Sequence, residues 1–260
     1  MHHPGAEHRM ERHQLFACSR SVAGIRPSNE DACYVSRISH HSGTILLLAV
    51  ADGLGGHPAG EVASGLAVRT FGEIVREQLL LLREPDRESL ETLMELAFRE
   101  TNLRVISVSF QEEGCQGMGT TLAAALITGT DDCIIGNVGD SRVYRIGEHL
   151  ERLTRDHSRV QELVDEGVLN PHEAERHPLK NIVTRIIGRE GDRADISSCR
   201  LGNARILLCS DGLLDGLTEQ EILAVAAEQN YPAVCDALIE AALARSRDNI
   251  TVVVAGRSGT

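Results

Sequence analysis

The chain has no long uninterrupted apolar run, and it has few basic residues for its acidic content. A membrane-spanning helix needs about eighteen or more consecutive apolar residues, and no stretch approaches that length. Lys and Arg number 26 against 38 Asp and Glu, which gives a net charge of −12. That charge repels nucleic acid, because binding to its phosphate backbone depends on Lys and Arg. We therefore expect neither a membrane span nor a nucleic-acid partner.

Paired metal-binding cysteines are also absent. The seven cysteines include no C-x-x-C pair and follow no regular framework. This pattern excludes a disulfide scaffold and a cysteine-rich zinc module. The sequence predicts reduced, mostly buried thiols, as in a cytoplasmic protein.

The length favours one domain. With 260 residues, 42% of them hydrophobic, the chain can bury one sizeable core. We expect a monomer with its domain over residues 14–257. Residues 1–13 are polar and His-rich without an apolar core, so they resemble neither a secretory signal nor a transit peptide. They are predicted to be a flexible leader.

Short apolar runs bounded by Gly, Asp, Asn or Thr predict strands. The gaps at 129–132 and 139–141 are short enough for hairpins, which favours antiparallel pairing. Helical periodicity occurs in two pairs. Because strands and helices segregate, we predict an α+β fold in which a sandwich of two antiparallel β-sheets is flanked by pairs of helices. The predicted strands are 44–51, 120–128, 133–138, 142–146, 205–209 and 250–255, and the predicted helices are 60–82, 87–110, 219–228 and 232–245.

A polar segment over about 158–190 interrupts the order of core strands. It contains Pro171 and Pro178 and one short helical pattern, VQELVDEGVL, whose apolar positions could dock on the body of the domain. We interpret this segment as an inserted lobe that is suited to recognition.

Acidic residues follow or precede the apolar strands. Asp52, Asp140 and Asp211 come directly after strand-like runs, and Asp248 stands just before the last strand. One Asp-Gly pair is usually a turn former. Four carboxylates at strand ends, with Asp31 in a further acidic cluster, instead predict a site where charge is paired with metal.

The ligand types restrict the ion. Carboxylate and backbone carbonyl oxygens, without Cys or closely spaced His, favour Mg²⁺ or Mn²⁺ over Zn²⁺. Several acidic ligands imply more than one ion. Two ions bridged by a carboxylate can activate water and neutralise the charge of in-line phosphoryl displacement, so the pattern predicts phosphoester hydrolysis.

Other catalytic motifs are missing. Residues 55–62 have the glycine spacing of a nucleotide-binding loop, but Glu61 and Val62 replace its lysine and hydroxyl residue. No G-x-S-x-G exists for a serine hydrolase. His57 and His157 are isolated in sequence, and we interpret each as a structural residue.

Eight motifs in register resemble the protein phosphatase 2C family, metal-dependent serine/threonine phosphatases, in its bacterial single-domain form. The similarity runs from about residue 15 to 256. The motifs are R-P-S-N-E-D at 26–31, A-D-G-L-G-G-H-P-A-G-E-V-A-S at 51–64, G-M-G-T-T at 117–121, N-V-G-D-S-R at 137–142, T-R-D-H-S at 154–158, H-P-L-K-N-I-V-T-R at 177–185, L-L-C-S-D-G-L at 207–213 and R-D-N-I-T at 247–251.

The resemblance implies roles for individual residues. Asp52 would bridge two ions, with a water or hydroxide between them attacking phosphoserine or phosphothreonine, and Asp31 would act mainly through metal-bound water. The enzyme would counteract a serine/threonine protein kinase, and 158–190 would be the flap lobe beside the active site. The resemblance also implies that the Gly53 carbonyl, Asp211 and Asp248 are ligands of the core ions. Asp140 with Asp211 would hold a weaker third ion, and Arg26 would bind the substrate phosphate.

One departure concerns the general acid. Eukaryotic members have a histidine after the D-G of the first metal motif, whereas this chain has Leu54. A general acid contributes typically about 10²–10⁴-fold, so the proton must come from elsewhere or from metal-bound water. Two alternatives stay open: a hydrolase of small phosphoesters, and a catalytically inactive signalling module, which the intact carboxylate set argues against.

Overall fold

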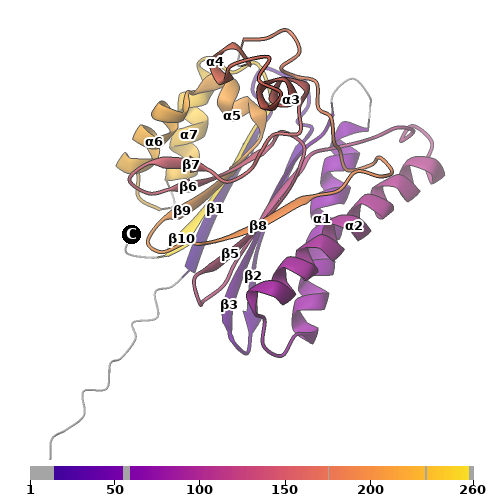
Figure 1. Ribbon diagram of the computed structural model, residues 1–260, viewed down its shortest axis with the longest axis vertical. Helices are drawn as coiled ribbons and strands as arrows, with labels where there is room; N and C mark the ends of the chain where they lie inside the picture. Colours follow the sequence, from indigo (N-terminus) through magenta and orange to yellow (C-terminus); the bar gives the residue numbers. More distant parts are fainter. Residues whose placement is uncertain (1–14, 55–58, 175, 232, 258–260) are drawn as a thin grey trace, which may run out of the picture.

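The computed structural model describes residues 15–54, 59–174, 176–231 and 233–257. Two five-stranded antiparallel sheets stack against each other, with helices on both outer faces (Figure 1). The predicted fold class is confirmed. The predicted leader over 1–13 and His57 lie outside the described residues.

The first sheet has the strand order β1-β10-β9-β6-β7, and the second has the order β2-β3-β4-β5-β8. The apolar run of β3 is buried throughout because it is a central strand with side chains packed on both faces. The strands are β1 (Leu15–Val22), β2 (Asp31–His40), β3 (Gly43–Asp52), β4 (Leu122–Ile127), β5 (Asp132–Val138), β6 (Arg142–Ile146), β7 (Leu150–Arg152), β8 (Asp195–Arg200), β9 (Arg205–Cys209) and β10 (Ile250–Arg257).

The long helices pack as predicted in pairs. The pair α1 and α2 covers the second sheet, and α6 and α7 lie with α5 on the first (Figure 1). Asp86 caps α2 by accepting a hydrogen bond from the Ser89 N–H at 2.9 Å, which satisfies one of the unpaired donors of the first turn. The helices are α1 (Gly60–Leu81), α2 (Arg87–Gln111), α3 (Arg159–Asp165), α4 (Pro171–Ala174), α5 (Asp211–Gly216), α6 (Glu219–Glu228) and α7 (Val234–Leu243).

Three buried apolar clusters hold these layers together. One lies between the second sheet and α1 with α2, one between the two sheets, and one between the first sheet and α5, α6 and α7. No helix in the described ranges has the length and apolarity that crossing a membrane requires.

One predicted hairpin is wrong. The gap at 129–132 joins β4 and β5 as an antiparallel hairpin, but the gap at 139–141 joins β5 to β6, which belong to different sheets. Gly139 has a φ of 105° and its Cα faces Thr121, where an added Cβ would lie 2.5 Å from Thr121 Cγ2. This left-handed glycine lets the chain cross between sheets instead of folding back.

The polar segment at 158–190 forms a lobe with α3 and α4, at the upper edge of the sandwich in Figure 1. The base of the lobe is fixed by main-chain hydrogen bonds. The Thr184 N–H donates to the His157 carbonyl at 2.8 Å, and Thr120 and Ile187 exchange bonds of 3.0 and 2.8 Å. Of the predicted apolar face, Val160 is buried, whereas Leu163, Val164 and Leu169 are half-buried.

Candidate metal centre

Strand register brings three aspartates to one end of the first sheet. Cys209, the last residue of β9, pairs with Val252 of β10 on one side and with Arg142 of β6 on the other. Because these positions are aligned, Asp211, two positions after the end of β9, and Asp248 and Asp140, each two positions before the start of β10 or β6, lie at the same end of the sheet. The other two aspartates come from the second sheet.

Asp31 and Asp52 are neighbours on adjacent strands of the second sheet. Asp31 begins β2, Asp52 ends β3, and the two are direct partners in the antiparallel register. Asp31 Oδ2 accepts a 2.7 Å hydrogen bond from the Ser210 hydroxyl, which links the two sheets. Asp31 Oδ1 is buried without a hydrogen-bond partner in the structure. A buried carboxylate oxygen without a donor is costly, so a bound cation is a natural partner for it.

The main chain at Asp52 and Gly53 is tightly fixed. Asp52 N–H donates to Thr121 Oγ1 at 2.9 Å, and its carbonyl accepts from the Thr120 hydroxyl at 2.8 Å. A Cβ on Gly53 would lie 2.3 Å from the Gly60 carbonyl oxygen, so no larger residue fits. The carbonyl of Gly53 therefore has a defined position at the end of β3.

Arg26 is bound to one of the aspartates. Its Nη2 donates to Asp248 Oδ2 at 2.7 Å, and its Nε donates to the Arg247 carbonyl at 3.2 Å. Its side chain is nevertheless 53% exposed. Arg26 is thus an oriented guanidinium at the edge of the carboxylate group and not merely a solvated surface residue.

The carboxylates destabilise one another's charged forms. Burial, followed by the charges of Asp211, Asp31 and Asp140, raises the pKa of Asp52 well above its usual range. Burial is also the first cause for Asp31 and Asp140, each of which has a pKa of about 7. The pKa of Asp211 is raised by burial and then by the charge of Asp248. Such mutual repulsion occurs only where carboxylates share one small region, and a cation there would relieve it.

His157 is a structural residue, as predicted. Its Nδ1 accepts a 3.1 Å hydrogen bond from Gly139 N–H, which leaves the proton on Nε2 for Asp195 Oδ2 at 3.0 Å. Burial lowers the pKa of His157. The neutral ring therefore supports the main chain next to Asp140.

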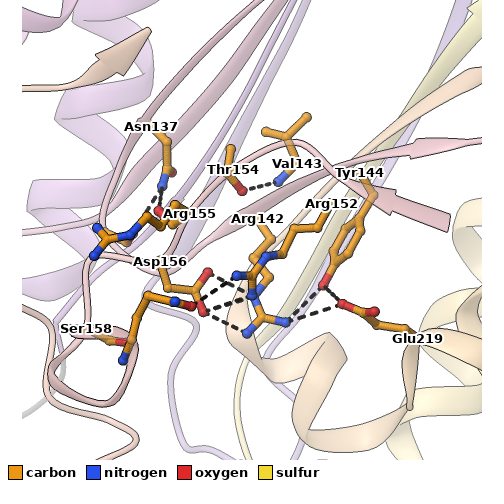
Figure 2. A network of polar contacts seen from close by, with 12 residues as sticks. Asn137, Arg142, Val143, Tyr144, Arg152, Thr154, Arg155, Asp156, Ser158 and Glu219 are labelled. Atoms are coloured by element: carbon orange, nitrogen blue, oxygen red, sulfur yellow. Dashed lines mark hydrogen bonds and ion pairs between the residues drawn. The ribbon is translucent and has the colours of Figure 1, made fainter. Parts of the chain in front are cut away.

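An ion-pair network fixes the other side of the Asp140 turn (Figure 2). Arg142 Nη2 donates to Asp156 Oδ2 at 2.7 Å, and its Nε donates to both oxygens of the same carboxylate at 3.0 and 3.1 Å. Arg142 Nη1 also donates to the Tyr144 hydroxyl at 3.0 Å, which in turn donates to Glu219 at 2.9 Å. The network ties β6 to the segment that leads into the lobe and to the start of α6.

Lys180 reaches from the lobe toward the carboxylates. Its Nζ lies 3.5 Å from Asp215 Oδ1 on α5. The charge of Lys180 lowers the pKa of Asp211, but this effect is smaller than the increase that burial causes.

Sequence reasoning missed the residues that orient these groups. Ser210 bonds Asp31 and also accepts the Thr251 N–H at 3.0 Å. The Asn249 side chain accepts from the Glu30 N–H at 2.8 Å and donates to the carbonyls of Ala23 and Ser28. Ser210 precedes Asp211 and Asn249 follows Asp248, each within one of the family motifs. This adjacency was the signal in the sequence that could have identified them as site residues.

In the described part of the chain, no group of three or more His, Cys, Asp or Glu side chains is arranged so that it could hold a metal ion. The candidate donors are instead spread around a shared region, and all are oxygens. That donor set fits hard cations that keep several water ligands.

Comparison with known proteins identifies the relatives. The sequence profile described as Protein phosphatase 2C matches residues 24–246. "Serine/threonine phosphatase stp" of Listeria monocytogenes serotype 4b (strain F2365) is 36% identical over 242 residues, covering 91% of this chain and 93% of that protein. The crystal structure of serine/threonine phosphatase Stp1 from Staphylococcus aureus has a TM-score of 0.84 at 32% identity, covering 95% of this chain and 96% of that one. The catalytic domain of PstP in complex with two manganese ions has a TM-score of 0.78 at 34% identity, covering 93% and 97%.

These relatives are serine/threonine phosphatases, and the two solved structures share the fold of this chain. The chain belongs to the protein phosphatase 2C family. Because this family consists of metal-dependent protein phosphatases, the enzyme class predicted from the motifs is confirmed.

Proposed function

We propose that this chain hydrolyses phosphoserine and phosphothreonine in proteins at a centre that holds two Mg²⁺ or Mn²⁺ ions. The observation that carries the proposal is the convergence of five aspartates from both sheets. Burial, followed by the charges of neighbouring carboxylates, raises the pKa of Asp31, Asp52, Asp140 and Asp211. The unpartnered Oδ1 of Asp31 supports it. So does the manganese complex of the relative PstP.

The resemblance to the family implies the ligand roles. Asp52 would be shared by the two ions, the Gly53 carbonyl would hold one of them, and Asp211 and Asp248 would complete the core. Asp31 would act mainly through water, and Asp140 with Asp211 would hold a weaker third ion. An ion that binds through one or two carboxylates plus waters and phosphate oxygens does not need a closed protein cage. The dispersed arrangement of the donors is compatible with that mode.

Bound divalent ions supply an activated water and neutralise the charge that develops in in-line displacement at phosphorus. The chain's own residues orient the substrate. Asp248 and the Arg247 carbonyl hold the Arg26 guanidinium in place, and its exposed side can bind phosphate oxygens in the bidentate manner of a planar fork. The Leu54 side chain has no ionisable group that could donate a proton. The leaving oxygen of serine or threonine must therefore be protonated by water or by another group.

The physiological substrates are phosphorylated proteins, including a cognate serine/threonine kinase or its targets. We propose that the enzyme works in the cytoplasm as a monomer and binds no nucleic acid. The flap lobe at 158–190 contributes to the choice of phosphoprotein, since it is attached to Thr120 beside Asp52 while much of its surface stays exposed.

The test is a substrate comparison with purified protein in Mn²⁺. A phosphoserine or phosphothreonine peptide should be cleaved with a higher kcat/KM than nucleotides, sugar phosphates or p-nitrophenyl phosphate. Preference for a small phosphoester would instead favour a metabolite hydrolase on the same centre. Absence of Mn²⁺-dependent turnover with every substrate would favour an inactive signalling module.

A further inference from the structure

Two thiols far apart in sequence lie in contact outside the metal centre. Cys18 on β1 and Cys235 on α7 are separated by 217 positions, and their Sγ atoms are 2.6 Å apart. All seven cysteines are free thiols. The contact is unusual because thiols are weak hydrogen-bond donors and acceptors, so no strong polar interaction requires it.

The packing of β1 on α7 holds this pair in place. Alternate residues of a strand share one face, so Phe16, Cys18 and Arg20 point together toward the last helix. The Phe16 ring contacts Tyr231 edge-on, and Arg20 Nε lies 3.5 Å from Asp236 Oδ1. The two thiols therefore meet between an aromatic contact and an exposed ion pair.

The two thiols differ in reactivity. Cys18 is partly exposed, whereas Cys235 is only 2% exposed. The contact with Cys235 lowers the pKa of Cys18, and the same contact raises the pKa of Cys235. Because the thiolate is the reactive form, Cys18 is the thiol that an oxidant reaches and attacks first.

We propose that Cys18 and Cys235 are a site of oxidative modification at which a hydroperoxide converts two thiols into one disulfide. In the first step the Cys18 thiolate attacks the terminal oxygen of the hydroperoxide and takes it as OH. The O–O bond breaks, the other oxygen leaves as hydroxide or alkoxide, and the Cys18 sulfur becomes a sulfenic acid. In the second step the Cys235 sulfur attacks Cys18, the S–S bond forms and the S–O bond breaks. The Cys235 proton leaves with that oxygen as water, and the hydroperoxide has accepted two electrons.

A second thiol pair provides an internal comparison. Cys133 and Cys199 are direct partners in the register of β5 and β8. Directly opposed strand residues keep their Cβ atoms about 4.5–5.5 Å apart, while a disulfide needs about 3.5–4.5 Å. The contact with Cys133 lowers the pKa of Cys199 to about 7, so this pair also offers a reactive thiol, and Cys133 is buried as Cys235 is. Geometry separates the two pairs, and the 2.6 Å contact of the Cys18 and Cys235 sulfurs favours disulfide formation between β1 and α7.

The new bond would join two segments that lead to the candidate metal centre. The strand β1 ends at Val22 and continues to Arg26, and α7 ends at Leu243 and continues to Asp248. Since Arg26 and Asp248 are bonded to each other, the disulfide would add a covalent link between two segments that already meet at the candidate metal centre. Closing so long a loop restricts the unfolded chain, which stabilises the fold.

The experiment uses the full-length, metal-free protein, reduced and then treated with hydrogen peroxide. Peptide mass spectrometry of the alkylated digest should find Cys18 joined to Cys235 with the loss of two hydrogens. The melting temperature should rise by roughly 10 °C and return on addition of dithiothreitol. Cys18→Ser and Cys235→Ala should each lose the cross-link and the shift, whereas the matched control Cys199→Ser should keep both.

Two results would overturn the proposal. One is a cross-link between Cys133 and Cys199 in place of the predicted one. The other is a wild-type protein whose peroxide response equals that of Cys18→Ser, with Cys18 recovered as a thiol or as an unpaired sulfinic acid. Using a variant at each of the two positions keeps the test decisive if the buried Cys235→Ala variant fails to fold. None of these readouts depends on phosphatase activity, so the outcome is independent of the proposed function.

Discussion

Replacing Ser210 by alanine removes two hydrogen bonds beside the proposed metal centre without replacing a proposed ligand. The Ser210 hydroxyl donates to Asp31 Oδ2 at 2.7 Å and accepts the Thr251 N–H at 3.0 Å. Ser210 is fully buried, so water cannot replace either bond without rearrangement. Ser210→Ala therefore leaves one buried main-chain donor and one buried carboxylate oxygen unsatisfied.

The expected loss follows from these two groups. An unsatisfied buried donor costs about 1–3 kcal/mol, and a hydrogen bond to a charged group contributes about 1.5–3 kcal/mol. The low values of both give a loss of about 2.5 kcal/mol in the free energy of unfolding. For a chain of this size each kcal/mol changes the melting temperature by about 2–4 °C, so Ser210→Ala should lower it by about 5–10 °C.

Calorimetry of the metal-free protein measures this shift, and Mn²⁺ titration then measures binding. Ser109→Ala is a matched control, because the Ser109 hydroxyl is also buried but donates only to the Ile106 carbonyl of its own helix. The control should lose less than half as much stability and bind Mn²⁺ as the wild type does. A melting temperature for Ser210→Ala no lower than that of Ser109→Ala would refute the bridging role of Ser210.

Three further predictions concern the substrate, the lobe and pH. Arg26→Ala should raise KM for a phosphopeptide and lower kcat if the guanidinium binds the transition state more tightly; unchanged kcat/KM in steady-state kinetics would contradict this. Joint alanine substitution of the exposed lobe residues Glu166, Val168 and His172 should reduce kcat/KM for a phosphoprotein but not for p-nitrophenyl phosphate, and an equal fall would indicate a structural role. Burial lowers the pKa of His157 in the folded protein, whereas the unfolded chain has a His pKa of about 6.5. Below that pH the unfolded chain binds a proton that the folded protein does not, so the folded protein loses stability as the pH falls. The stability advantage of the wild type over His157→Asn, measured in urea without metal, should shrink as pH falls through that range, and a constant difference would exclude the linkage.

The sequence predicted the buried elements and missed exposed or short ones. The run at 44–51 is apolar at nearly every position, and β3 extends from Gly43 to Asp52. In contrast, β1 and β2 have several partly exposed positions, and β7 contains three residues, so their patterns are weak. The spacing of Gly139–Ser141 allowed a hairpin, but spacing alone does not determine which sheet the next strand joins.

The candidate site shows the same division. The aspartates were recognisable because acidic residues at the ends of apolar strands are conspicuous in the sequence. The bond from Arg26 to Asp248 spans 222 positions, and no local pattern predicts a contact of that kind. The positions of Ser210 and Asn249 likewise depend on tertiary packing, since each bonds to the segment at 23–31.

Calorimetric titration of Mn²⁺ into the wild type and Asp211→Asn, with phosphopeptide turnover measured on the same samples, tests the two-ion centre most directly. The wild type should bind two ions and a weaker third, while Asp211→Asn should keep its circular dichroism spectrum but lose Mn²⁺ binding and nearly all turnover. Asp236→Asn is the matched control, because Asp236 is 62% exposed and pairs only loosely with Arg20 at 3.5 Å. Wild-type Mn²⁺ stoichiometry and turnover in Asp211→Asn would contradict the assignment of these carboxylates to the metal.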